Sequence, residues 1–187
     1  MQSSALQLVF PARGSRVTLR RLQPSDLRAF QAYRHDEMLG RYQGWTATSD
    51  VEALNFLRRA GADERFVPGD WVQIGIANSD TLTLIGDIGI HLSADCVTAE
   101  IGFTLQCEAH GGGLATDAVH QAIMMIFAQT PVATIVGVTD ARNAGSMRLL
   151  ERVGMTLQSS AETVFRGEAC MEHTYSIRRN NNVQFGA

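Results

Sequence analysis

The sequence has few of the features that define several large protein classes. Its three cysteines, Cys96, Cys107 and Cys170, are an odd number and lack the paired spacing of a zinc site, which predicts free thiols in a reducing cytoplasm. No apolar run approaches the roughly 18 residues of a membrane span. The first ten residues lack the basic start and the long apolar run of a signal peptide. We therefore expect a cytoplasmic protein without a metal ion and without a membrane partner.

Charge of either sign is also scarce. Charged residues make up 19% of the chain, and the net charge is −3 with a pI near 5.9. Nothing in this balance suggests general binding of nucleic acids. Hydrophobic residues make up 45% of the 187 residues, which is ordinary for a globular protein, and this length suits one domain over residues 1–187. We expect its core over about residues 17–178, flexible tails, and either a monomer or a homodimer.

The most informative pattern is a run of three glycines, Gly111, Gly112 and Gly113. Upstream, residues 100–106 alternate apolar and polar side chains with the period of a half-buried strand. Downstream, apolar residues recur at helical spacing over residues 114–127. The glycines therefore lie where a strand turns into a helix, and without Cβ atoms they let a ligand approach the backbone closely. Since the first free N–H groups of a helix favour an anion, the expected ligand carries phosphates.

Two common phosphate-binding motifs do not match this loop. The Walker pattern requires Lys-Ser or Lys-Thr after the last glycine, and the sequence has neither there. The dinucleotide fingerprint is half present, because Gly111-x-Gly113 is followed by Thr116 where glycine or alanine is needed. A nicotinamide oxidoreductase is therefore a weak alternative. On the glycines alone, an ordinary glycine-rich turn also stays open.

Three segments, taken together, resemble the GNAT superfamily of N-acetyltransferases. Residues 108–118 resemble its motif A, Gln/Arg-x-x-Gly-x-Gly/Ala, with Gly111 and Gly113 on the two glycines. Residues 100–105, Glu-Ile-Gly-Phe-Thr-Leu, are similar to a strand of the RimJ/RimL-type ribosomal-protein N-terminal acetyltransferases. Residues 143–155 are similar to that branch's Asn-x-x-Ser-x-x-x-x-Glu-Lys-x-Gly-Phe. Three motifs in the right order over about 55 residues are specific, whereas a lone glycine loop is weak.

The order of the expected elements agrees with the architecture of this family. We expect an α/β fold of the α+β mixed-sheet kind, mostly antiparallel with one central parallel pair, and with helices on both faces. The expected helices begin near Ser25 or Asp26, at Ser49 with Glu52 in a capping box, after the glycine loop, and at Asn143. The expected strands span residues 17–22, 71–77, 82–92, 98–106, 133–139, 156–165 and 168–177.

The resemblance also implies where acetyl-coenzyme A binds. In the family, its pantetheine arm enters a wedge between the strand before the glycine loop and the next parallel strand. The N–H groups after the loop hold the pyrophosphate. Asn143 is implied to pair with the pantetheine amides, although it also has the chemistry of a helix N-cap. The residues implied to bind the coenzyme are Phe103, Thr104, Leu105, Gln106, Gly111, Gly112, Gly113, Leu114, Ala115, Thr116, Asn143 and Ser146.

The implied reaction is acetyl transfer to a primary amine, of a protein N-terminus or of a small molecule, by direct attack in a ternary complex. Glu100 is the expected general base, since burial would raise its pKa; an exposed glutamate paired to an arginine is the alternative. Many members use a tyrosine as the acid for the thiolate, but here that position is Leu150, so Ser146 is the nearest substitute. The candidates for an acceptor wall, with simple packing as the alternative, are Tyr42, Trp45 and Trp71.

Departures from the motif leave a second function possible for this protein. Glu108 stands where motif A prefers glutamine or arginine, and Gly112 replaces the usual basic or polar residue. Together with Leu150, they are compatible with a non-catalytic sensor of acyl-coenzyme A that kept the loop and lost turnover. Among the histidines, His110 is the one beside the loop and the one worth testing.

Overall fold

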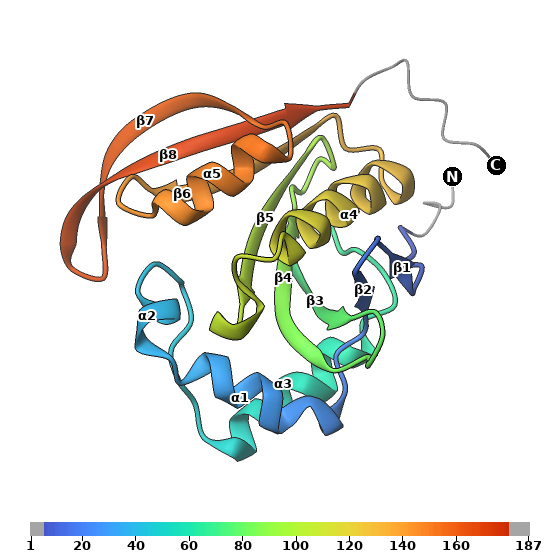
Figure 1. Ribbon diagram of the computed structural model, residues 1–187. Coiled ribbons are helices and arrows are strands. Elements are labelled where there is room, and N and C mark those ends of the chain that lie inside the picture. Colours follow the sequence, from blue (N-terminus) through green and yellow to red (C-terminus); the bar gives the residue numbers. More distant parts are fainter. Residues whose placement is uncertain (1–5, 180–187) are drawn as a thin grey trace.

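A computed structural model describes residues 6–179, which form an eight-stranded mixed sheet with helices on both faces (Figure 1). The strand order is β1-β2-β3-β4-β5-β6-β8-β7. The pair β5–β6 is parallel and the other neighbouring pairs are antiparallel, as the sequence predicts. The strands are β1 (Ala12–Arg13), β2 (Val17–Arg20), β3 (Trp71–Asn78), β4 (Leu84–Leu92), β5 (Thr98–Leu105), β6 (Thr134–Asp140), β7 (Thr156–Phe165) and β8 (Glu168–Arg178).

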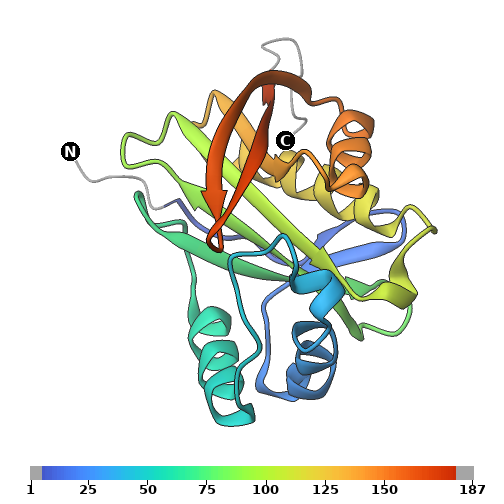
Figure 2. The same cartoon turned by 90° about the vertical axis from the view of Figure 1, so that its left-hand side faces the viewer.

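The helices form two groups, one on each face of the sheet (Figure 2). One group precedes β3 and packs Phe30, Tyr33 and Leu57 against Leu84 of the sheet and Leu22 of the segment after β2. The other group follows β5 and contributes to the larger core. The helical elements are η1 (Pro24–Asp26), α1 (Leu27–Arg34), α2 (Glu37–Gly40), α3 (Asp50–Ala62), η2 (Cys107–Ala109), α4 (Leu114–Gln129) and α5 (Ala144–Arg152).

Local sequence accounts for where these helices begin. The expected capping box opens α3: the backbone N–H of Ser49 donates to Glu52 Oε2 at 2.9 Å, and the hydroxyl of Ser49 accepts from the N–H of Glu52 at 3.4 Å. Asn143 caps α5 by accepting from the N–H of Ser146 at 3.2 Å. The helix α4 differs, because its N-cap is Gly113 and no side chain caps it.

The pairing of β5 with β6 is short and ends inside the sheet. The register joins Thr98 with Thr134 and ends at Glu100 with Val136. Beyond that pair both strands continue, β5 to Leu105 and β6 to Asp140, without pairing to each other. The two strands therefore diverge in a wedge whose vertex lies at Glu100, and the wedge opens toward the start of α4.

The termini of the core differ from the sequence expectation. Residues 6–16 were expected to be a flexible tail, but Leu8 is only 4% exposed in the main core and Ala12–Arg13 pairs with β2. At the other end, Arg179 donates to the carbonyls of Val132 and Thr130 at 2.9 and 2.7 Å. The expected tails at residues 1–5 and 180–187 lie outside the described residues.

Candidate active site

The wedge between β5 and β6 contains a narrow cleft of about 50 Å³. It brings together predicted site residues that lie far apart in the sequence, from the loop after α2, from β5 and from the start of α5. One wall is apolar, because Leu150 packs within 2.8 Å of the position that a Cβ on Gly137 would take. The lining residues are Tyr42, Gln43, Ile101, Gly102, Phe103, Gly137, Val138, Thr139, Asn143, Ser146 and Leu150.

The backbone of β5 offers its polar groups to the wedge at alternate residues. The carbonyl of Phe103 accepts from Gln43 Nε2 at 3.2 Å, and the carbonyl of Leu105 lies 2.9 Å from His110 Nε2. By contrast, the N–H of Gln106 donates to the carbonyl of Ile85, the second residue of β4. Because an antiparallel ladder alternates, the main chain of Thr104 also faces β4. Of the four residues in and just after β5 that are implied to bind the coenzyme, Phe103 and Leu105 therefore direct their carbonyls to the wedge, and Thr104 and Gln106 do not.

The glycine loop has the backbone conformation that the sequence suggested. Gly111 and Gly113 have φ of +78° and +76°, in the left-handed region that favours glycine. The carbonyl of Gly113 accepts from the N–H of Asp117, which starts the ladder of α4. The N–H groups of Leu114, Ala115 and Thr116 precede that bond and lie at the uncapped helix start, where they are free for a ligand.

Glu100 is half-buried at the vertex, on the sheet face that carries α1. Thr104 lies four residues from Glu100 along β5, so the two side chains are on the same face of the sheet. Thr104 pairs with Asp87 of β4, whose carboxylate accepts hydrogen bonds from Tyr33 and Arg34 of α1. Burial raises the pKa of Glu100, the nearby Glu172 raises it further, and His91 lowers it. The ion pairs found within residues 6–179 do not include Glu100, so the alternative of an arginine-paired glutamate has no support.

The three aromatic candidates have different surroundings. Tyr42 lines the wedge. The ring of Trp45 lies 4.5 Å from the guanidinium of Arg34, so it is engaged in packing. Trp71 is half exposed and packs against His91 with tilted rings whose centroids are 5.3 Å apart. The strand register places Trp71, His91 and Glu100 in one cross-strand row. The structure therefore does not gather the three into one wall.

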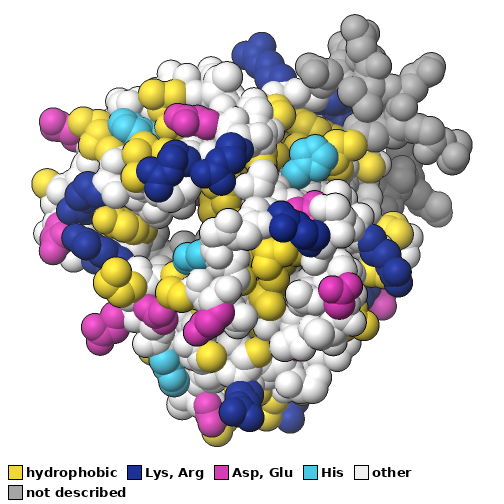
Figure 3. All heavy atoms as spheres, in the orientation of Figure 1, with side chains coloured by type: hydrophobic (Ala, Val, Ile, Leu, Met, Phe, Trp, Pro, Cys, Tyr) yellow, Lys and Arg dark blue, Asp and Glu magenta, His cyan; other side chains and the backbone are white. Residues whose placement is uncertain are grey.

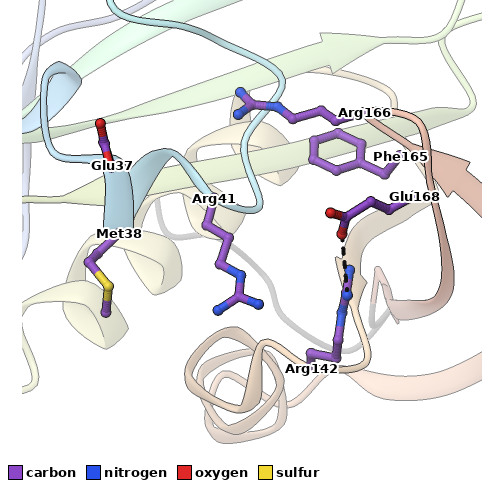
Figure 4. Close-up of a pocket in the computed structure, with 7 residues that line it drawn as sticks. All are labelled: Glu37, Met38, Arg41, Arg142, Phe165, Arg166 and Glu168. Carbon is purple, nitrogen blue, oxygen red and sulfur yellow. Dashed lines mark ion pairs between the residues drawn. The ribbon is translucent and has the colours of Figure 1, made fainter.

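Sequence reasoning missed an arginine-rich pocket of about 420 Å³ beside the wedge (Figure 4). Arg142 precedes Asn143 of the wedge, and its guanidinium is held by Asp140 through two hydrogen bonds of 2.9 and 2.6 Å. Arg166, on the β7–β8 turn, donates to the carbonyl of Gln43 at 2.8 Å. No sequence signal links these residues, which come from three distant segments. The lining residues are Glu37, Met38, Arg41, Arg142, Phe165, Arg166 and Glu168.

Together, the mixed sheet, the parallel pair that splays apart and the glycine loop at the start of α4 define an acyltransferase of the GNAT fold. The sequence profile of the acetyltransferase (GNAT) domain matches residues 16–156, which is more than half of the chain. The chain therefore belongs to the GNAT acetyltransferase family. It is an N-acetyltransferase, and acetyl-coenzyme A is its co-substrate. This sets aside the nicotinamide oxidoreductase and the non-catalytic sensor.

Solved structures show the same fold. A GNAT-family acetyltransferase from Bacillus anthracis is 19% identical, with a TM-score of 0.80 over 90% of this chain and 98% of that one. The ribosomal α-N-protein acetyltransferase RimL, in complex with coenzyme A, is 15% identical, with a TM-score of 0.74 over 91% and 98%. The microcin self-immunity acetyltransferase MccE, in complex with acetyl-coenzyme A and AMP, is 15% identical, with a TM-score of 0.74 over 88% and 93%. A search of curated proteins finds no match.

No helix within residues 6–179 is both long enough and apolar enough to cross a membrane. In the same residues, no group of three or more His, Cys, Asp and Glu side chains is placed to hold a metal ion.

Proposed function

We propose that the protein transfers the acetyl group of acetyl-coenzyme A to a primary amine by direct attack within a ternary complex. The observation that carries this proposal is the position of Glu100, a half-buried carboxylate at the vertex where β5 and β6 separate. The coenzyme enters the wedge from the side of the glycine loop. The amine approaches from the sheet face that carries α1, on which Glu100 lies.

Main-chain and amide groups of the wedge match a pantetheine arm. The carbonyls of Phe103 and Leu105 face the wedge, and each carbonyl oxygen has two acceptor positions. The arm therefore adds to, or displaces, the contacts that Gln43 and His110 make there. Asn143 uses its side-chain oxygen to cap α5, which leaves its amide NH₂ free to donate to a pantetheine carbonyl. The cap and the coenzyme contact are thus compatible.

The reaction needs a neutral amine, a polarised thioester carbonyl and a proton for the leaving thiolate. The carboxylate of Glu100 takes a proton from the ammonium, directly or through one water, and its raised pKa makes it a stronger base than an exposed glutamate. The amine nitrogen then bonds to the acetyl carbon and the carbon–sulfur bond breaks. Leu150 offers no proton, so the hydroxyl of Ser146, which lines the same cleft, protonates the thiolate. Ser146 is then reprotonated, through water, by the second proton that the amine nitrogen loses as it becomes an amide.

The acceptor is either a protein N-terminus or a small-molecule amine. Two structural neighbours differ in this respect by name, since RimL is a ribosomal α-N-protein acetyltransferase and MccE is a self-immunity acetyltransferase for microcin C7. Both kinds of acceptor carry an ammonium group, and the charges near the vertex suit it. Glu172 lies close enough to Glu100 to raise the pKa of Glu100, so two carboxylates are near the reacting position. Two carboxylates attract an ammonium group before it gives up its proton.

The variant Glu100→Gln tests this mechanism, because it keeps the shape of the side chain and removes its basicity. We expect kcat to fall by about 10²–10⁴-fold, the usual worth of general-base catalysis. Affinity for acetyl-coenzyme A stays near native, and activity recovers partly at high pH as free amine becomes available. Glu64→Gln, an exposed glutamate on the N-terminal side of β3, is the matched control.

The kinetic constants separate the possible roles of Glu100. A panel of amines and N-terminal peptides is assayed by thiol release at saturating acetyl-coenzyme A. If only the KM for the acceptor rises, Glu100 binds the ammonium and is not the base. If kcat and KM both match the wild type, Glu100 takes no part in the mechanism.

A further inference from the structure

A second cleft, of about 440 Å³, lies between the first turns of α4 and the end of α5. It borders the glycine loop through Gly113 but shares no lining residue with the wedge. Two of its residues are arginines from distant parts of the chain, Arg16 before β2 and Arg152 at the last position of α5. The lining residues are Arg16, Gly113, Thr116, Asp117, His120, Arg152 and Val153.

Hydrogen bonds to Asp117 hold the turn that contains Arg16 against the glycine loop. The carboxylate of Asp117 accepts from the backbone N–H groups of Ser15, Arg16 and Val17 at 3.3, 2.8 and 3.1 Å. Burial alone would raise the pKa of Asp117, but these hydrogen bonds outweigh burial and lower it. The guanidinium of Arg16 then reaches Gly113, where its Nη2 lies 2.6 Å from the position that a Cβ would occupy.

The charges around this cleft favour an anion. Asp117 is the one carboxylate among its lining residues, and three N–H groups already satisfy it. The two arginines are both exposed, and within residues 6–179 neither takes part in a salt bridge. On the face shown in Figure 3, basic side chains lie over α5 and beside the start of α4.

These arginines stand where the loop itself lacks a cation. Gly112 and Glu108 replace the basic or polar residues that the family motif prefers. The chain contains no lysine, so all 16 of its basic residues are arginines, whose planar guanidinium binds a phosphate through two parallel hydrogen bonds. The cations nearest the loop thus come from outside residues 108–118: Arg16 precedes β2, and Arg152 takes the lysine position of the motif in residues 143–155.

We propose that Arg16 and Arg152 form a subsite for the 3′-phosphate of coenzyme A. This inference rests on the placement of the pyrophosphate at the glycine loop. A single ribose joins the 3′-phosphate to the pyrophosphate, so the 3′-phosphate must fall close to that loop. A phosphate monoester carries about −1.5 to −2 charges at neutral pH, more than each unit of the pyrophosphate, and it gains most from two guanidinium groups. The two arginines therefore select coenzyme A over its 3′-dephospho form.

The experiment compares two ligands, acetyl-coenzyme A and acetyl-3′-dephospho-coenzyme A, by calorimetry on the full chain. The proteins are the wild type, Arg16→Gln, Arg152→Gln and the double variant. Arg28→Gln is the matched control, because Arg28 is exposed on α1 at the opposite face of the sheet and the charge change is the same. Melting temperatures check that each variant is folded, and the two single variants test the subsite independently.

We expect the wild type to bind acetyl-coenzyme A about tenfold or more tightly than the dephospho form, as charge-assisted hydrogen bonds allow. The ratio falls in each single variant and approaches one in the double variant, while Arg28→Gln keeps the wild-type ratio. The ratio also shrinks as salt rises, since the contact is exposed.

Two results overturn the subsite. One is a wild-type ratio near one. The other is an equal loss for both ligands in the variants, which assigns the arginines to the pyrophosphate. If the wild type binds neither ligand, the placement of the coenzyme at the glycine loop is wrong. That outcome differs from failure of the subsite, in which the wild type binds both ligands.

Discussion

Alanine in place of each of the three loop glycines separates backbone strain from loss of ligand contact. Gly111 and Gly113 both have φ in the left-handed region, where an L-residue costs about 1–2 kcal/mol. Gly112 lies outside that region, and a Cβ there would meet only Leu114 Cγ at 4.0 Å. For a chain of this size about 1 kcal/mol shifts Tm by about 2–4 °C. We therefore expect Gly111→Ala and Gly113→Ala each to lower Tm by about 2–8 °C, and Gly112→Ala to leave it near native.

Binding distinguishes the two strained positions. A Cβ on Gly111 meets no atom within 4 Å, whereas a Cβ on Gly113 would lie 2.6 Å from Arg16 Nη2 and must move it. The guanidinium is the flexible end of its side chain, so its movement adds little to the stability cost. We expect Gly113→Ala to weaken acetyl-coenzyme A binding by about tenfold more than Gly111→Ala, the worth of one charge-assisted contact.

The assay combines thermal unfolding with calorimetry of acetyl-coenzyme A on the three variants. Equal Tm losses at Gly111 and Gly113, with unequal losses of affinity, support the reasoning. Native affinity in folded Gly113→Ala would refute it, and so would a Tm loss in Gly112→Ala as large as that of its neighbours.

Three further predictions concern single side chains. Glu108→Gln should tighten acetyl-coenzyme A binding, and more so at low salt where repulsion is less screened; unchanged affinity at both salt levels would show that the side chain points elsewhere. Ser146→Ala should lower kcat with little change in coenzyme affinity, and wild-type turnover would leave water or the acceptor as the acid. Asp87→Asn should destabilise the fold by about 3–5 kcal/mol in urea unfolding, because Asp87 is 2% exposed and its loss of charge leaves the buried guanidinium of Arg34 unpaired. Asp80→Asn, on an exposed turn, is its control, and equal stabilities would contradict the buried pair.

Local patterns predicted the elements of this fold well. The strand period over residues 100–106 and the helical spacing after the loop were both confirmed, as was the capping box at Ser49. The parallel pair followed from the crossover of one helix between two strands. Each of these signals lies within a few turns or one hairpin, where side-chain spacing and hydrogen bonding determine the conformation.

Features that depend on distant contacts were not predictable in this way. The two-residue strand β1 is too short to show a period, so the sequence pattern predicts a tail over residues 6–16. Arg179 continues the core because its guanidinium binds carbonyls at and beyond the end of α4, such as that of Thr130, which the helix ladder leaves free. Nothing in the sequence near Arg179 indicates that contact. The arginine pocket beside the wedge has the same origin, since Arg142 and Arg166 meet only in the folded chain.

The candidate site shows why departures from a motif are weak evidence for lost function. Within residues 108–118, Glu108 and Gly112 stand where the family motif prefers basic or polar residues, so this segment alone predicts weaker binding of a phosphate. In the folded protein, Gly112 removes the side chain of one position only. The electrostatic potential at the loop depends on all charged groups nearby. Arg16 reaches Gly113 because Asp117 fixes the turn before β2 to the first turn of α4. A motif compares the residues of one segment only. A phosphate is attracted by any guanidinium group near it in space, whichever segment carries that group. A basic residue can therefore be absent from the motif while a cation is still present at the binding site.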